Sequence, residues 1–156
     1  MLYISLMKVE NQILNPLSAY SIALKKIEES GIVPTKQRRI LAKILFQKGN
    51  RHISAENLFD EVKKEHRKIS LATIYNTLKQ FTNLGIIREI VVDKNKSLYD
   101  TDNRPHYHLY IEDEGKIHDI PTDNINLNLP SVPACLTLHD IDIIVRVRSL
   151  KDNNKS

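Results

Sequence analysis

The hydrophobic pattern of this chain changes period near Gly85, and this change restricts the fold more than any other feature. Before it, apolar residues recur every three or four positions in four segments, which predicts four helices. After it, residues 86–92 and 97–99 alternate like two β-strands joined by the polar turn 93–96. Short helices followed by a two-stranded hairpin are typical of a winged helix-turn-helix, in which the last helix enters the DNA major groove.

Residues that favour helix termini mark where these helices begin and end. The first is predicted over 17–30 and stops at Gly31. Thr35, Ser54 and Ser70 each precede an apolar stripe, so each is a predicted N-cap.

Beyond residue 103 the pattern is that of short strands. Residues 106–112 and 116–120 are predicted strands, and the prolines that follow leave room for at most a short helix. Residues 138–148 are rich in β-branched side chains and are predicted to form a long strand. About 45 residues with three strands bury too little surface to be stable alone. We therefore expect this part either to pair with a second copy or to pack on the N-terminal domain.

The sequence thus predicts an α+β protein with an N-terminal winged helix-turn-helix and a small C-terminal part rich in strands. Translation starts at either Met1 or Met7. Because we find neither a transmembrane run nor a signal peptide, we expect a cytoplasmic protein that does not bind membranes. The predicted parts are a flexible extension (1–16), the DNA-binding domain (17–103), a C-terminal domain (104–150) and a polar tail (151–156).

Charge is distributed unevenly between these parts. Residues 1–103 carry 17 Lys and Arg against 11 Asp and Glu, whereas residues 104–156 carry 6 against 8. A basic N-terminal part suits a polyanion such as nucleic acid, although a solvated lysine-rich surface is the alternative.

Two histidines form the most distinctive chemical cluster. His106 and His108 are two positions apart on a predicted strand, so both imidazoles point to the same side and can reach one ion. Asp100 precedes them, and Asp119 lies on the neighbouring predicted strand. Imidazoles with carboxylates suit Zn, Mn, Fe or Co better than Ca. An incidental surface pair is the alternative, because a single His-x-His is a weak signal.

Enzymatic activity is not expected. Cys135 is the single cysteine and has no nucleophile signature around it, and with four glycines the chain has no phosphate-binding loop. A metallohydrolase built on the histidine cluster would need a general base, for which only Glu112 and Glu114 are near. A protein-only interaction module is the remaining alternative, and the basic helical region argues against it.

Several motifs in register resemble the ferric uptake regulator family over roughly residues 20–148. Within it, Asn76-Thr77 and Arg88-Glu89 resemble the iron response regulator branch, as does the lack of Cys-x-x-Cys pairs. The family motifs are at 35–38, 52–56, 70–78, 85–87, 96–100, 106–108 and 115–117, and the branch is also matched at 119–121 and 145–148.

The resemblance implies a homodimer in which residues 104–150 form a C-terminal α/β dimerisation and sensing domain. It also implies binding to AT-rich operator DNA through a recognition helix at 70–84. Tyr75 matches an aromatic residue that contacts thymine methyls, and Asn76 stands where many members have Arg, so it favours adenine over guanine. Val33 stands where relatives usually have a basic residue. The implied DNA contacts are Lys36, Arg38, Ser70, Thr73, Tyr75, Asn76 and Lys79.

The resemblance also implies a regulatory metal site that ties the two domains together, with His118 competing for the role of Asp119. A second family site is reduced to His139. Haem binding at His106, Tyr107 and His108 is a further expectation of the branch. The function implied is an iron- or haem-responsive repressor, and the alternative is a regulator that senses Zn, Mn or peroxide. The implied ligands of the regulatory metal are His52, Asp100, His106, His108 and Asp119.

Overall fold

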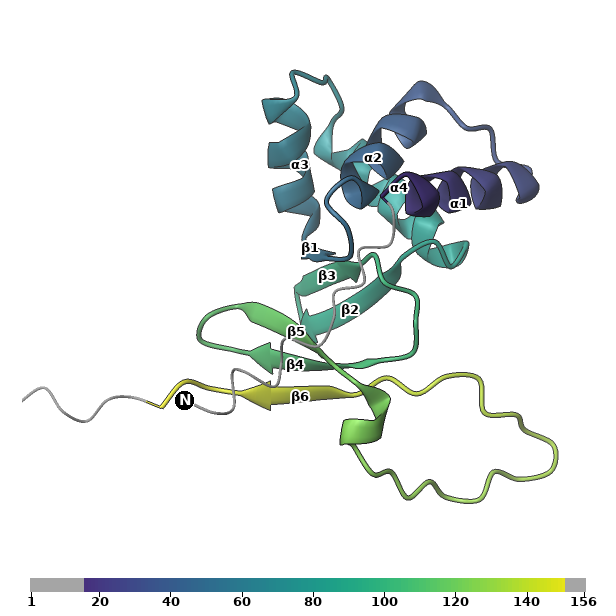
Figure 1. Ribbon diagram of the computed structural model, residues 1–156, viewed down its shortest axis with the longest axis vertical. Coiled ribbons are helices and arrows are strands. Elements are labelled where there is room, and N and C mark those ends of the chain that lie inside the picture. Colours follow the sequence, from purple (N-terminus) through teal and green to yellow (C-terminus); the bar gives the residue numbers. More distant parts are fainter. Residues whose placement is uncertain (1–15, 151–156) are drawn as a thin grey trace, which may run out of the picture. The chain divides into compact units, whose positions relative to one another are not determined.

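The computed structural model describes residues 16–150, which form two compact units (Figure 1). The first ends at Asn103 and the second begins at Arg104. The expected flexible extension lies outside the described residues except for Pro16, and the expected polar tail lies outside them entirely.

Helices make up most of the first unit. The side chains of Thr35, Ser54 and Ser70 each accept a hydrogen bond from the backbone amide three residues later, at 3.4, 3.1 and 3.1 Å, so the three predicted N-caps are confirmed. The helices are α1 (Pro16–Glu29), α2 (Lys36–Phe46), α3 (Ala55–Lys64) and α4 (Leu71–Asn83).

A small antiparallel sheet completes this unit. Strands β2 (Arg88–Asp93) and β3 (Lys96–Asp100) form the predicted hairpin. A third strand, β1 (His52–Ile53), pairs with β3 and was not predicted, because two residues are too few to show an alternating pattern. The sheet order is β1-β3-β2.

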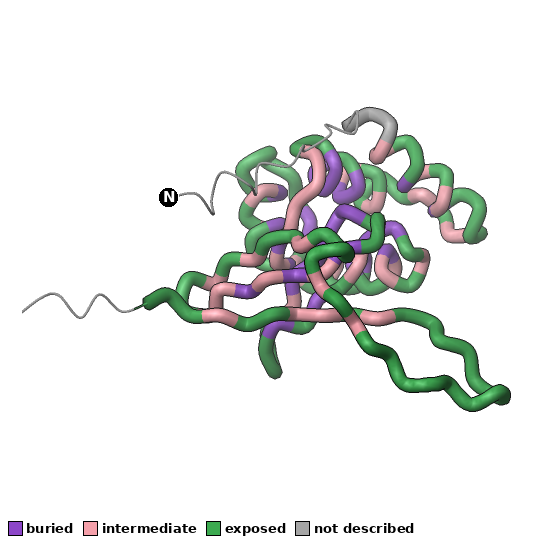
Figure 2. Tube along the Cα trace, turned by 60° about the horizontal axis from the view of Figure 1, so that its bottom comes forward, coloured by how far each residue is buried: buried purple, intermediate pink, exposed green. Residues whose placement is uncertain are grey.

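The hydrophobic core of the protein belongs to the first unit. Apolar stripes of the four helices meet over the sheet, and Ile27, Leu45, Leu58, Ile74 and Phe81 are completely buried. In Figure 1 the helices gather on one side of the sheet, and Figure 2 shows that the buried positions follow them. The result is a winged helix-turn-helix, as the sequence predicts.

The second unit is a three-stranded sheet of order β5-β4-β6. Strands β4 (Tyr107–Ile111) and β5 (Lys116–Ile120) are antiparallel, whereas β6 (Ile144–Val147) pairs with β4 in parallel. Among the described residues between β5 and β6, the 3-10 turn Thr122–Asn124 is the one helical element, in line with the predicted limit of a short helix.

The predicted long strand at 138–148 is wrong in length, because residues 138–143 lie outside β6. Strand β4 offers a ladder partner only as far as His108, which pairs with Ile144. The preceding segment also contains Asp140 and Asp142, and aspartate is unfavourable in strands.

The second unit has little core of its own. Tyr110 is its single buried apolar side chain among residues 104–150, and the segment between β5 and β6 is almost entirely exposed (Figure 2). Leu129, Val132, Leu136 and Leu138 of that segment are all exposed apolar residues. Within residues 16–150, the helices are all too short or too polar to cross a bilayer.

Candidate metal ligands and nucleic-acid interface

In the first unit, strand pairing brings a histidine opposite an aspartate. His52 of β1 is the register partner of Asp100 of β3, and its Nε2 lies 3.8 Å from Asp100 Oδ2. The other carboxylate oxygen, Oδ1, accepts a hydrogen bond from the amide of Asp102 at 2.8 Å. At 3.8 Å the imidazole and carboxylate do not form a direct hydrogen bond. The two atoms are near enough for one ion to reach both at the metal–ligand bond lengths of about 2.0–2.2 Å.

Arg51 fixes β1 to the helices next to His52. Its guanidinium donates to both carboxylate oxygens of Glu61 at 2.9 and 3.0 Å and to the carbonyls of Ile44 and Leu45 at 2.8 and 3.2 Å. Burial alone would raise the pKa of Glu61, but the hydrogen bonds from Arg51 and Lys48 outweigh it and hold that pKa below its usual value. The strand that carries His52 is therefore held by a bidentate ion pair between Arg51 and Glu61.

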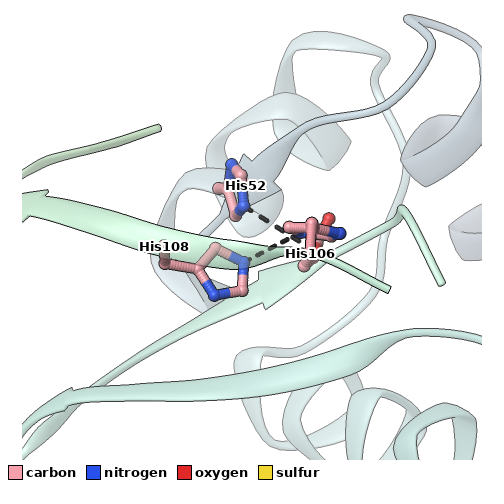
Figure 3. A group of neighbouring side chains, drawn as sticks. His52, His106 and His108 are labelled. Atoms are coloured by element: carbon pink, nitrogen blue, oxygen red, sulfur yellow. Dashed lines mark hydrogen bonds and ion pairs between the residues drawn. The ribbon is translucent and has the colours of Figure 1, made fainter. Parts of the chain in front are cut away.

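In the second unit, two imidazoles face each other. His106 directly precedes β4 and His108 lies within it, and their Nε2 atoms are 3.0 Å apart (Figure 3). His106 Nδ1 is 2.7 Å from the carbonyl oxygen of Arg104. Because a carbonyl only accepts, Nδ1 carries the proton and Nε2 keeps its lone pair. Imidazoles that bind metals are commonly held in this way, by a backbone acceptor on the second ring nitrogen.

Asp119 lies beside this histidine pair. It is the register partner of His108 on β5, and its Oδ1 is 3.5 Å from His106 Nε2. His118 pairs with Leu109, one position along, so it faces the other side of the sheet. Tyr107 also alternates with His108, which places its ring on the opposite face. Sequence reasoning missed Asp142, whose Oδ1 is 3.9 Å from His108 Nδ1.

The predicted recognition helix presents a polar face to solvent. Tyr75, Asn76 and Lys79 are all exposed on α4, while Ile74 and Leu78 of the same helix are buried in the core. Ser70 and Thr73 are joined at the start of the helix by a hydrogen bond of 2.9 Å between their hydroxyls. A helix divided in this way can place its exposed face in a groove without disturbing the fold.

The two predicted basic contacts of α2 lie in different surroundings. Lys36 is exposed at the start of the helix. Arg38 is half-buried and donates through Nε to Gln80 Oε1 at 2.9 Å and through a terminal nitrogen to the carbonyl of Val33 at 2.7 Å. Arg38 therefore links α2 to α4 as well as carrying charge.

Sequence reasoning also missed Glu56, which meets Tyr75 across the helix-turn-helix. The Tyr75 hydroxyl donates a hydrogen bond to Glu56 Oε1 in the first turn of α3. The two residues are 19 positions apart, and no local pattern pairs them.

Comparison with known proteins gives consistent results. The model of the ferric uptake regulator family matches residues 29–145. The peroxide-responsive repressor PerR of Staphylococcus aureus strain Mu50 is 31% identical over 104 residues, which cover 67% of this chain and 70% of that protein. The structure of the ferric uptake regulator of Pseudomonas aeruginosa with manganese matches with a TM-score of 0.66 at 20% identity, over 83% of this chain and 99% of that one. A zinc-bound manganese uptake regulator matches with a TM-score of 0.56 at 27% identity, over 82% and 98%.

Proposed function

This chain belongs to the ferric uptake regulator family of metal-responsive transcription regulators, and we propose that it is a homodimeric repressor whose binding to operator DNA is controlled by iron. The observation that carries this proposal is the presence of a donor pair in each unit: His52 with Asp100, and His106 with His108.

Neither pair is a complete metal site by itself. Structural ions such as Zn²⁺ take four protein ligands, and Fe²⁺ and Mn²⁺ accept imidazole together with carboxylate. We therefore propose that both pairs bind the same ion, and that Asp119 supplies a further oxygen. The proposed ligands are His52, Asp100, His106, His108 and Asp119.

Such sharing would couple ligand binding to DNA binding. His52 and Asp100 belong to the winged-helix unit and the two other histidines to the second unit. When all four side chains hold one ion, the angle between the units is restricted, and so is the distance between the recognition helices of a dimer. A dimer binds two half-sites of fixed spacing, so this restriction changes operator affinity.

The surface of the first unit supports DNA as the partner. The end of α3 and the turn that leads into α4 carry Lys63, Lys64, Arg67 and Lys68, all exposed. Cations next to a recognition helix suit the phosphate backbone. Asn76 suits adenine and Tyr75 suits the thymine methyl group, which favours AT-rich operators.

The composition of the second unit supports assembly with a second copy. It buries one apolar side chain of its own and exposes several others, and β6 is an edge strand. A second copy that covers this surface would supply the missing core. Without it, the three short strands have too little buried area to remain folded.

Two other ligands follow from specific observations. A peroxide-responsive repressor is the second candidate, because this chain is similar to PerR, a repressor of that kind, and covers 70% of its length. Haem is a weaker candidate, since Tyr107 faces away from His108 and the three predicted haem residues do not share one side of the sheet.

The test is a DNA-binding titration of the metal-depleted full chain. The probe is the duplex that the protein selects from a random-sequence pool, and Fe(II), Mn(II), Zn(II) and haem are added separately at two salt concentrations. We expect Fe(II) to change operator affinity more than tenfold, and brief peroxide treatment to leave that change in place. Loss of the change on peroxide treatment would favour the second candidate, and equal affinity under all conditions would refute metal control.

A further inference from the structure

A hydrogen bond joins the residue expected to read bases to a residue on the preceding helix. Tyr75 is 44% exposed on α4, and its hydroxyl donates to Glu56 Oε1 of α3. Ser54 caps α3 and fixes the first turn, in which Glu56 lies. The acceptor thus stands on a well-defined helix end, outside the hydrophobic core.

Both partners are in the protonation state that this bond requires. The hydrogen bond from Tyr75 is the main reason that the pKa of Glu56 lies below its usual value of 4.5. The same bond raises the pKa of Tyr75 above 10. Near neutral pH, a carboxylate therefore accepts from an intact phenol, and hydrogen bonds to charged acceptors are the stronger kind.

An exposed tyrosine without such a partner samples several rotamers. On entering a groove it loses that freedom, which weakens binding to the correct sequence. A side chain already held in one orientation avoids most of this loss. The carboxylate has a second effect, since a negative charge beside a recognition helix opposes binding to phosphates of any sequence.

We propose that Glu56 is a positioning residue for DNA recognition: it holds the Tyr75 ring in the orientation that reads the operator, while its charge lowers the affinity for DNA of every sequence. This inference rests on the proposed function, because it requires α4 to be the reading helix. It assigns to Glu56 a role in specificity, whereas its location in the first turn of α3 would by itself suggest only helix stabilisation.

The two effects can be separated by substitution. Glu56→Ala removes acceptor and charge, so we expect the ratio of operator to non-operator affinity to fall about three- to tenfold. Glu56→Gln keeps an oxygen that accepts from the phenol but removes the charge. We expect it to raise both affinities and to retain more of the ratio than Glu56→Ala does. Tyr75→Phe keeps the ring and removes the donor, so it should lower the ratio without raising non-operator affinity.

The experiment measures the affinity of the full chain for two duplexes, the one selected by the parent from a random pool and a scrambled duplex of equal composition. The parent, the three single variants and the Glu56→Ala/Tyr75→Phe double variant are compared, with thermal unfolding as a check on the fold. We expect the double variant to show no larger loss of ratio than either single variant, because both break the same bond.

The outcomes distinguish this inference from the proposed function. A Glu56→Ala protein that is folded and keeps the parent's ratio overturns the positioning role alone, as do additive losses in the double variant. A parent that selects no duplex overturns the proposed function, and this inference with it.

Discussion

The imidazoles of His106 and His108 approach each other through Nε2, at 3.0 Å, while Nδ1 of His106 donates to the carbonyl of Arg104. The backbone thus selects the tautomer that leaves a lone pair on the Nε2 of His106. This arrangement suits two imidazoles that bind one ion better than it suits two unrelated surface side chains.

Replacement of both His106 and His108 by Ala should abolish the effect of metal on operator binding and leave a folded protein. His118→Ala is the matched control, because His118 lies in the same sheet on the opposite face. The measurement is operator affinity with and without Fe(II) for each variant. A double variant that keeps the parent's metal-dependent shift would show that these histidines are not the sensor.

Substitution of His52 should have a different result, since it removes one ligand of the first unit only. In His52→Ala the remaining donors still hold metal, about ten- to 100-fold more weakly, and the coupling to DNA is reduced, because Asp100 is then the one proposed ligand from the first unit. This expectation follows because coupling requires a ligand from each unit. Metal affinity by calorimetry and operator affinity by fluorescence anisotropy, measured on the same protein, separate the two quantities. Parallel loss of both would contradict the proposed division of roles.

Much of the fold could be predicted from the sequence, because local patterns determine it. Ser54 and Ser70 are N-caps that act within four residues, and the hairpin 88–100 alternates with a two-residue period. The two-residue strand β1 and the parallel pairing of β4 with β6 could not be predicted. Both depend on contacts between residues far apart in the chain, and neither leaves a periodic signal.

Part of the candidate site could likewise be predicted from the sequence, and part could not. The joint orientation of His106 and His108 follows from strand alternation alone. The position of His52 opposite Asp100 follows from β1, so a family resemblance suggested it and no local pattern did. Glu56 was missed for a similar reason, since its contact with Tyr75 depends on how α3 and α4 pack.

Lys79→Ala should weaken binding to operator and non-operator DNA alike. Lys79 is exposed on the same helix face as Tyr75, where a lysine reaches phosphate and not base edges. Removal of one phosphate contact lowers the slope of log affinity against log salt by about 0.9. Lys25→Ala on α1 serves as a control for charge alone, because Lys25 is exposed and paired with Glu29 at 3.6 Å. An unchanged salt slope in Lys79→Ala would show that this lysine does not contact the backbone.

Val145→Glu should convert the proposed dimer to a monomer. Val145 is 37% exposed on β6, an edge strand of the second unit, so the charge does not enter the chain's own core. It would instead be buried unpaired against a second copy, which is strongly unfavourable. Sedimentation velocity of the parent and the variant gives the answer directly. A variant that sediments as the parent dimer would place the interface elsewhere.

The end of β6 should detach from the β4–β5 turn in acid. Both carboxylate oxygens of Asp113 accept from the amide of Ser149, at 3.0 and 3.2 Å, and this hydrogen bond lowers the pKa of Asp113 below its usual 3.8. The pKa of Glu114 also lies below its usual 4.5. The main cause is the hydrogen bond from Lys116, and the second is the hydrogen bond from the Ser149 hydroxyl. Groups with a lowered pKa stabilise the fold at pH values above their usual pKa and lose that effect as the pH falls through the lowered value.

The contacts of Ser149 should therefore be intact at neutral pH, start to weaken below about pH 4.5 and be lost only below pH 3.8. The amide proton shift of Ser149 in the metal-free protein, followed by NMR from pH 7 downward, reports this directly. Asp113→Asn keeps an accepting oxygen but does not titrate, so its Ser149 shift should change much less. A midpoint at or above 3.8 in the parent, or the same curve in both proteins, would show that Asp113 does not hold this end of the strand.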